Sequence, residues 1–191
     1  MLDFLHHLFG AVCGQNPDHT WAPGGLLLPC CQRCLGLYAG AGMAALLHLW
    51  LRPPLTGRFL QAHGGFLLLM APFGFHWLPQ GPVLRTITGL LFGFGIFTFL
   101  WLPMSRRFAD LASSRARPIH PCATYAIGLG LAAGLVPLLA ACGGRGTAYA
   151  LSGLVCFGLA ALAVVICGNA VLALSGVVQW VRRASQLRHQ Q

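Results

Sequence analysis

The chain has 191 residues, which is enough for one domain, but its composition excludes an ordinary soluble one. Hydrophobic residues make up 57% of it and charged residues only 8%, whereas a soluble domain carries about 25% charged residues. A chain so poor in charge cannot cover a surface that faces water, although it can face lipid. The sequence therefore predicts an integral membrane protein whose first partner is the lipid bilayer.

The net charge of +9 comes from twelve arginines and three aspartates, with no lysine and no glutamate. The arginines stand between apolar runs, and no aromatic and basic platform for nucleic acid accompanies them, so we assign them to membrane topology and expect no nucleic-acid partner. The three aspartates all lie outside the apolar runs. Their position argues against a proton-coupled transporter and against hydrolysis by a pair of carboxylates.

Residues 1–33 are predicted to form an N-terminal segment outside the bilayer. Residues 1–12 are too short to span it and lack the basic start of a signal peptide, so we expect a small interfacial helix there. Residues 13–33 are rich in glycine and proline and are expected to form a loop.

Five apolar runs follow, and they predict an all-α, polytopic transmembrane helical bundle of about five spans over residues 34–180. The first four runs cover about residues 34–51, 60–78, 84–103 and 121–142. The fifth begins near Thr147 and stays apolar to about Trp180. It is longer than the ~20 residues of a span but too short for two crossings, so we expect one long helix whose weakest point is Gly168-Asn169.

Two further patterns describe the bundle. Glycines four residues apart predict close helix packing, and the pairs are Gly36 with Gly40, Gly89 with Gly93, and Gly130 with Gly134. Histidines His48 and His63 fall at the ends of predicted spans, where we expect them to be tolerated interface residues rather than ligands.

Arginine placement predicts the orientation. Three arginines fall on the side of the N-terminus and nine on the other side, if residues 181–191 form a basic tail there. Basic loops stay in the cytoplasm, so the N-terminus is predicted outside and the C-terminus inside, in a prokaryotic inner membrane. The two sets are Arg33, Arg85 and Arg145, against Arg52, Arg58, Arg106, Arg107, Arg115, Arg117, Arg182, Arg183 and Arg188.

Cys31 and Cys34 form a Cys-x-x-Cys motif at the outer start of the first span. A thiol at a helix N-terminus faces the positive end of the helix dipole, and Arg33 adds positive charge, so the motif favours thiolates. Thiolates exchange disulfides and bind soft metal ions. Attachment of a c-type haem would need histidine after the second cysteine, and Leu35 stands there.

The residues around this motif repeat the pattern of a known family. They are Cys13-Gly14-Gln15, Pro17, Cys31-Gln32-Arg33-Cys34, Gly36, Tyr38, Gly40, and then Arg85, Thr88, Gly89 and Gly93. Over about residues 10–100 the chain resembles the uncharacterised prokaryotic membrane family called domain of unknown function 2085 (DUF2085). The resemblance implies no particular reaction. The chain departs from the pattern at Gly14, where the family has histidine, and near Phe73, where it often has an acidic residue.

The predicted topology brings several of these residues to the outer face and makes them the candidate site. They are Cys13, Gln15, Cys31, Arg33, Cys34, Arg85 and Thr88. An oxidising compartment favours a structural disulfide among the three cysteines, whereas Cys30 is expected to pack. A zinc or copper(I) site on Cys13, Cys31 and Cys34, with His76 as the fourth ligand, is a second interpretation. Thiol exchange linked to quinone is a third.

The function expected from these patterns is that of a non-catalytic helical bundle, or of an accessory subunit bound to other membrane subunits, with a cysteine site on its outer face. The alternatives are a quinone-linked thiol-disulfide oxidoreductase and a metal-binding membrane protein. The sequence leaves open whether the protein is an enzyme.

Overall fold

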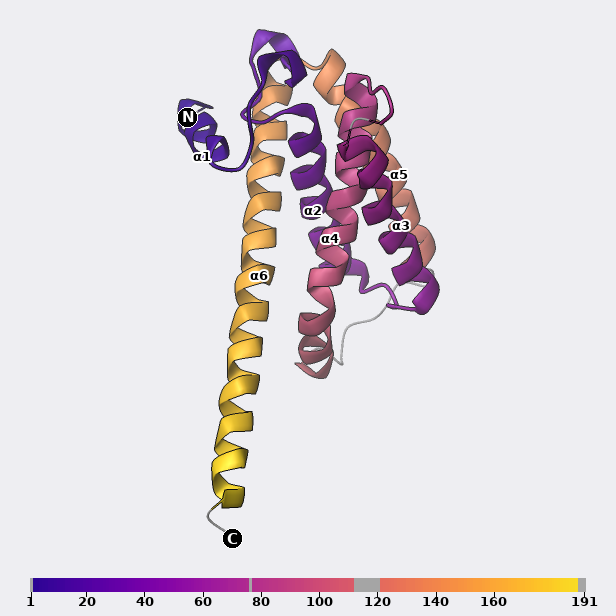
Figure 1. The fold of residues 1–191 in the computed structure, drawn as a ribbon. Helices are drawn as coiled ribbons and strands as arrows, with labels where there is room; N and C mark the ends of the chain where they lie inside the picture. The colour runs from indigo at the N-terminus through magenta and orange to yellow at the C-terminus, as the bar shows by residue number, and fades with distance from the viewer. Residues whose placement is uncertain (1, 76, 112–120, 189–191) are drawn as a thin grey trace.

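The computed structural model describes residues 2–75, 77–111 and 121–188, and all regular structure in these ranges is helical. Five long helices run alternately down and up to form a bundle, and a short N-terminal helix lies beside its upper end (Figure 1). The predicted all-α fold is confirmed. The elements are α1 (Leu2–Gly10), η1 (Pro17–His19), η2 (Pro23–Gly25), α2 (Gln32–Leu51), α3 (Gly57–Gly74), α4 (Pro82–Leu111), α5 (Pro121–Cys142) and α6 (Arg145–Arg188).

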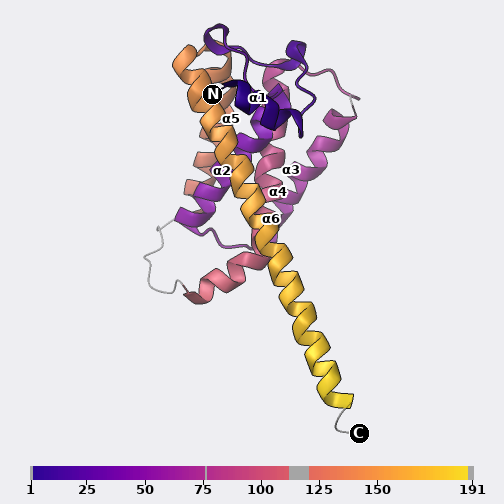
Figure 2. The same cartoon turned by 90° about the vertical axis from the view of Figure 1, so that its left-hand side faces the viewer.

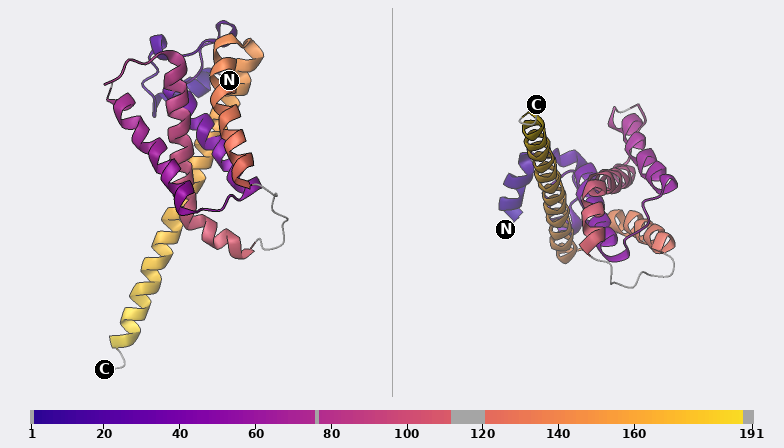
Figure 3. Two further views of the ribbon diagram at one scale, coloured as in Figure 1. Left: turned by 90° about the vertical axis from the view of Figure 1, so that its right-hand side faces the viewer. Right: turned by 90° about the horizontal axis from the view of Figure 1, so that it is seen from below.

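The structure supports four to five spans. α3 has 18 residues and is less apolar than the other long helices, because Arg58, Gln61 and His63 lie in its first two turns. It nevertheless leads the chain from the lower end of α2 back to the upper end, where α4 begins (Figures 2 and 3). The helices that are long and apolar enough to cross a membrane are α2, α4 from Pro82 to Ser105, α5, and α6 from Arg145 to Trp180.

α2 lies at the centre of the bundle and packs against α4, α5 and α6. Its closest neighbour is α4, which runs in the same direction (Figure 1). A Cβ atom on Gly36 or Gly40 would overlap the backbone of α4, and one on Gly89 or Gly93 would overlap the backbone of α2. The first two predicted glycine pairs therefore lie opposite each other in one interface, where the absence of side chains lets the backbones touch.

The third predicted pair, Gly130 and Gly134 of α5, packs against none of the described residues, and that prediction is wrong. A Cβ atom at either position would meet nothing within 4 Å. A different glycine brings α6 close to α2. It is Gly158 of α6, where a Cβ atom would overlap the backbone carbonyl of Tyr38 on α2.

α6 is one unbroken helix of 44 residues, as predicted. At its expected weak point it is attached to α4: Gly168 packs against Met104, and the Asn169 Nδ2 donates to the Leu100 carbonyl at 2.7 Å. Its apolar stretch of 36 residues is about 54 Å long, against ~30 Å for a hydrocarbon core. The helix accordingly continues beyond the lower end of the other helices (Figures 1 and 2).

Four buried polar side chains from four helices meet inside the lower half of the bundle. His48 of α2 has its Nε2 3.0 Å from the Thr98 hydroxyl of α4, and His63 of α3 has its Nε2 3.0 Å from the Tyr125 hydroxyl of α5. The Thr98 and Tyr125 side chains also interact. Both histidines are buried among aromatic rings. The expectation that they are interface residues is therefore wrong.

The proton positions at His63 follow from its partners. The Phe59 carbonyl can only accept a hydrogen bond, so the His63 Nδ1, 2.9 Å away, carries a proton and donates. In the neutral ring the Nε2 is then an acceptor, and the Tyr125 hydroxyl donates to it. This network joins α3 to α5.

Tyr125→Phe is expected to destabilise the bundle by about 1–3 kcal/mol, because it leaves the buried His63 Nε2 without a donor. Thermal unfolding in detergent measures the effect. Tyr149→Phe is the matched control, since Tyr149 is 47% exposed on α6 and its hydroxyl is expected to matter by less than about 0.5 kcal/mol. Equal unfolding temperatures for the two variants would contradict the assigned network.

Candidate functional site

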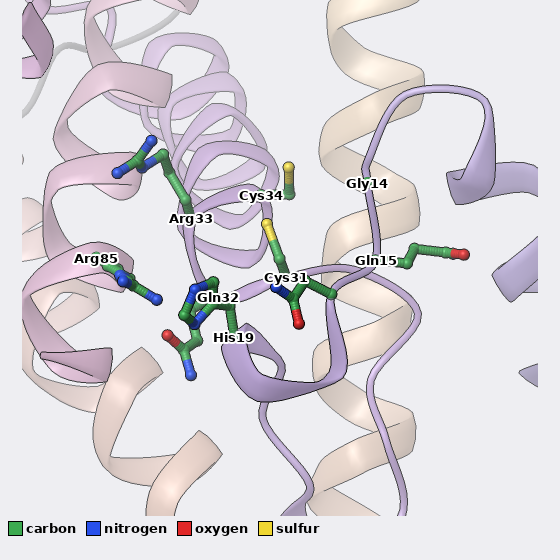
Figure 4. A pocket seen from close by; sticks show the side chains of 9 residues that line it. Gly14, Gln15, His19, Cys31, Gln32, Arg33, Cys34 and Arg85 are labelled. Atoms are coloured by element: carbon green, nitrogen blue, oxygen red, sulfur yellow. The ribbon is translucent and has the colours of Figure 1, made fainter. Parts of the chain in front are cut away.

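The loop between α1 and α2 folds over the upper end of the bundle and brings Cys13 to the start of α2 (Figure 1). Gln15 holds this loop in place, because its Nε2 donates to the carbonyls of His6 at 2.6 Å and Pro29 at 2.8 Å. Its φ of 45° is left-handed, a conformation that a residue other than glycine keeps only where the surroundings impose it. Its side chain points away from the cysteines in Figure 4. This candidate residue therefore shapes the site from the edge.

Three thiols converge at this point. Cys31 is the N-cap of α2, Cys34 lies in the first turn of the same helix, and Cys13 comes from the loop. Their Sγ atoms all lie within 4.8 Å of one another, and the Cys31 backbone N–H donates to the Cys13 Sγ at 3.3 Å. The structure thus brings together the three cysteines that the sequence proposed as ligands. His76, the proposed fourth ligand, lies outside the described residues.

Cys31 is the thiol most readily ionised. A hydrogen bond donated by the Cys34 thiol lowers the pKa of Cys31 to about 5 against the opposing effect of burial. The Cys13 thiol and the backbone N–H groups at the start of α2 also contribute to this lowering. The thiolate predicted from the helix N-terminus is therefore expected at Cys31 at neutral pH.

Cys30 differs from its neighbour although the two are adjacent in the sequence. Its side chain is 1% exposed and belongs to the hydrophobic core. Burial, together with the nearby thiols, raises the pKa of Cys30 well above that of an ordinary cysteine. It packs, as expected, and serves below as a matched control for Cys31.

Arg33 joins the site to the upper end of α3. Its Nη2 donates to the Phe73 carbonyl at 2.9 Å and to the Gln80 Oε1 at 3.1 Å, and the Gln80 amide also bonds to the Phe73 carbonyl. Phe73 lies near the point at which the sequence departs from the resembled pattern by lacking an acidic residue. Its backbone carbonyl is a hydrogen-bond acceptor for Arg33 in this chain.

The two threonines after Arg85 have different partners. The Thr88 hydroxyl donates to the Leu84 and Arg85 carbonyls of its own helix, and Thr88 does not line the pocket described below. The Thr86 hydroxyl accepts a hydrogen bond of 2.9 Å from the Trp21 indole and so attaches the loop to α4.

A pocket of about 300 Å³ opens beside the thiols (Figure 4). It contains five predicted site residues and also Gln32, His19 and Asn16, which sequence reasoning missed. Gln32 lies inside the Cys-x-x-Cys motif, so its position was a usable signal, whereas nothing in the sequence distinguishes His19 from other loop residues. The complete lining is Gly14, Gln15, Asn16, His19, Cys31, Gln32, Arg33, Cys34 and Arg85.

The part of the chain that builds this pocket matches a known protein family. Residues 13–99 match the family described as predicted membrane protein (DUF2085). This match, the DUF2085 segment, covers slightly less than half of the chain. No curated protein and no solved structure matches the chain.

The DUF2085 segment contains the structural elements that build the site. It begins at Cys13, includes the motif at Cys31 and Cys34, and covers both sides of the glycine interface between α2 and α4. α5 and α6 lie outside the match. At the departure Gly14, a Cβ atom would meet nothing within 4 Å of the described residues.

Alkylation of Cys31 by iodoacetamide is expected to keep its rate between about pH 8 and about pH 6 and to slow as the pH falls through 5, because thiolate is the reactive form. The sign follows from the lowered pKa, since the thiolate is populated above that pKa and lost below it. Mass spectrometry of the modified peptide gives the rate. A midpoint near 8.5, the value of a free thiol, would contradict the assigned hydrogen bonds.

Proposed function

We propose that this membrane protein binds one soft d10 metal ion, zinc(II) or copper(I), through the thiolates of Cys13, Cys31 and Cys34. The observation that carries the proposal is the convergence of three Sγ atoms within 4.8 Å of one another. Sulfur ligands about 2.3 Å from one ion stand about 4 Å apart, so small side-chain movements complete the site. A disulfide accounts for only two of the three thiols.

The charges around the thiols favour a soft ion. None of the residues lining the pocket is Asp or Glu, which are the ligands that calcium and magnesium require. Thiolates select copper(I) and zinc instead. The excess negative charge of three thiolates is offset by Arg33, by Arg85 and by the N-terminus of α2.

Zinc takes four ligands, so three thiolates would leave one of its positions for another ligand. We infer a role in binding or passing on the ion; the pocket lining has no carboxylate, and His19 is the imidazole in it that could move a proton. A non-catalytic bundle of this kind suits an accessory subunit of a larger membrane complex, and this part of the proposal predicts that other subunits co-purify in mild detergent. Isolation of a monomer that turns over a small substrate would exclude it.

We also propose that the pocket faces the outside of a prokaryotic inner membrane, with the C-terminus in the cytoplasm. Arg33, Arg85 and Arg145 lie at the starts of α2, α4 and α6, at the upper end. The larger set lies at the lower end: Arg52 and Arg58, Arg106 and Arg107 of α4, and Arg182, Arg183 and Arg188 of α6. The richer set of arginines is expected on the cytoplasmic side. A membrane-impermeant thiol reagent applied to intact cells should label a cysteine introduced at Asp18, and protection of that cysteine would reverse the orientation.

Elemental analysis of protein purified without chelators tests the metal proposal. The expected result is about one equivalent of zinc or copper per chain, which protects Cys13, Cys31 and Cys34 against alkylation. Chelators should remove the metal, and the three thiols should then become reactive. Substoichiometric metal that leaves all three thiols equally reactive would rule the proposal out.

Thiol-disulfide exchange is a second candidate, and the hydrogen bond between the free thiols of Cys31 and Cys34 favours it. A low-pKa thiol beside a resolving thiol is the arrangement that exchange needs. The dithiol would lose two electrons and two protons to a quinone as its disulfide forms. Trapping of thiols in cells decides between the two candidates: a redox state that changes on quinone depletion supports exchange, and reduced, metal-protected thiols support binding.

A further inference from the structure

Two side chains that line the pocket beside the thiols each carry a buried polar atom that no described protein group satisfies. Gln32 is 4% exposed, lines the pocket, and its Oε1 accepts no hydrogen bond from the described part of the chain. The Arg33 Nε is also buried without an acceptor there. Buried polar atoms are nearly always paired, so an unpaired acceptor and an unpaired donor in one pocket point to a ligand that offers both.

Two arginines line the pocket, and they outnumber the one thiolate expected there, at Cys31. Arg85 lines it from α4 and Arg33 from α2, and no acidic residue appears in its lining. Arg33 uses its Nη2 on Phe73 and Gln80, which leaves its Nε for another partner. The first turn of α2 adds the positive end of the helix dipole, while its backbone N–H groups at Arg33 and Cys34 bond to the Cys31 thiolate.

We propose that the pocket binds a phosphate group that carries, or stands next to, a hydroxyl. The phosphate oxygens accept from Arg33 and Arg85, and the hydroxyl donates to the Gln32 Oε1. This chemistry occurs in hydrogen phosphate, in phosphate monoesters and in the glycerol-phosphate headgroup of an anionic lipid. The volume of about 300 Å³ is at the small end for ligand pockets and exceeds what a bare phosphate needs. The inference goes beyond metal binding and does not depend on it.

Calorimetric titration of the full-length protein in phosphatidylcholine nanodiscs tests the proposal with inorganic phosphate, glycerol 3-phosphate and sulfate. Sulfate resembles phosphate in shape and charge but has no O–H donor at neutral pH. Both phosphates are expected to bind at least about tenfold more tightly than sulfate, because only they satisfy Gln32. The titrations use both chelator-treated and metal-loaded protein, so binding to the two forms separates this site from the metal site.

Two variants assign the contacts. Gln32→Met removes the acceptor while keeping the length of the side chain, and it is expected to abolish the preference for phosphate over sulfate. Arg85→Gln is expected to weaken all three probes by about tenfold or more. Circular dichroism checks that each variant folds. If Gln32→Met does not fold, the affinities of Arg85→Gln for the three probes decide the result, because Arg85 is only half-buried and its substitution disturbs the fold less.

Nanodiscs that contain phosphatidylglycerol identify the source of the ligand. Loss of phosphate binding in them assigns the pocket to a lipid headgroup, and unchanged binding assigns it to a soluble phosphate; both results support the proposal. Three results overturn it: no binding of phosphate in phosphatidylcholine nanodiscs, equal affinity for sulfate and phosphate, or a preference that survives in folded Gln32→Met.

Discussion

Gly93→Leu is expected to prevent the bundle from assembling. A Cβ atom at Gly93 would overlap the Leu37 carbonyl of α2, and the rest of the leucine has no space between two backbones in contact. α2 and α4 would have to separate along the closest interface of the fold. The cost is expected to be about 4 kcal/mol or more, which is large compared with the stability of most domains. The yield of monodisperse protein in detergent and its unfolding temperature measure it.

Gly130→Leu is the matched control for that experiment. It makes the same change in a spanning helix, at a position where a Cβ atom would meet nothing within 4 Å. It is expected to leave yield and unfolding temperature near those of the unmodified protein. If Gly93→Leu behaved like Gly130→Leu, the parallel contact between α2 and α4 would be wrong.

Cys31→Ser is expected to weaken metal binding by more than about a hundredfold. The substitution removes the thiolate that is already ionised at neutral pH and leaves two sulfur ligands in place of three. Losing even an outer-shell partner of a metal ligand costs about 10–100-fold in affinity, so losing a ligand costs more. Competition titration against a chelator of known affinity gives the value.

Cys30→Ser is the control for Cys31→Ser. The same chemical change is made one residue earlier, at a thiol that is buried in the core and lies outside the cluster. Its metal affinity is expected to stay within about threefold of that of the unmodified protein. Equal losses in the two variants would show that the effect arises from folding and not from ligation.

Much of the bundle could be predicted because a membrane simplifies the pattern. Long apolar runs between arginines located four spans, and glycine spacing located both sides of the interface between α2 and α4. The same spacing failed at Gly130 and Gly134, because it does not reveal which face of a helix meets a neighbour. With 25 glycines in the chain, contacts rather than spacing decide their role.

The buried network of His48, Thr98, Tyr125 and His63 could not be predicted for a related reason. Hydropathy places the ends of a span within a few residues, and a histidine near such an end reads as an interface residue. Whether it points to lipid or to the interior depends on helix rotation. Here rotation directs both histidines inward, where residues from two other helices satisfy them.

The sequence predicted the thiols and three other residues that line the pocket, Gln15, Arg33 and Arg85, but not Gln32, His19 or Asn16. Cys31 and Cys34 share the first turn of a helix, so their proximity follows from their spacing. Cys13 joins them only through the fold of the loop, which the Gln15 hydrogen bonds hold in place. Gln32 has no motif of its own, and its unpaired oxygen becomes visible only when its surroundings are known.

X-ray absorption at the zinc or copper edge of the purified protein tests the central claim most directly, because it counts the atoms bound to the ion. The account predicts a shell of three sulfur atoms about 2.3 Å from the metal, from Cys13, Cys31 and Cys34. In Cys31→Ser the sulfur count should fall to two or the metal should be lost. A shell of nitrogen and oxygen alone, or a metal-free protein with a disulfide between Cys31 and Cys34, would contradict it.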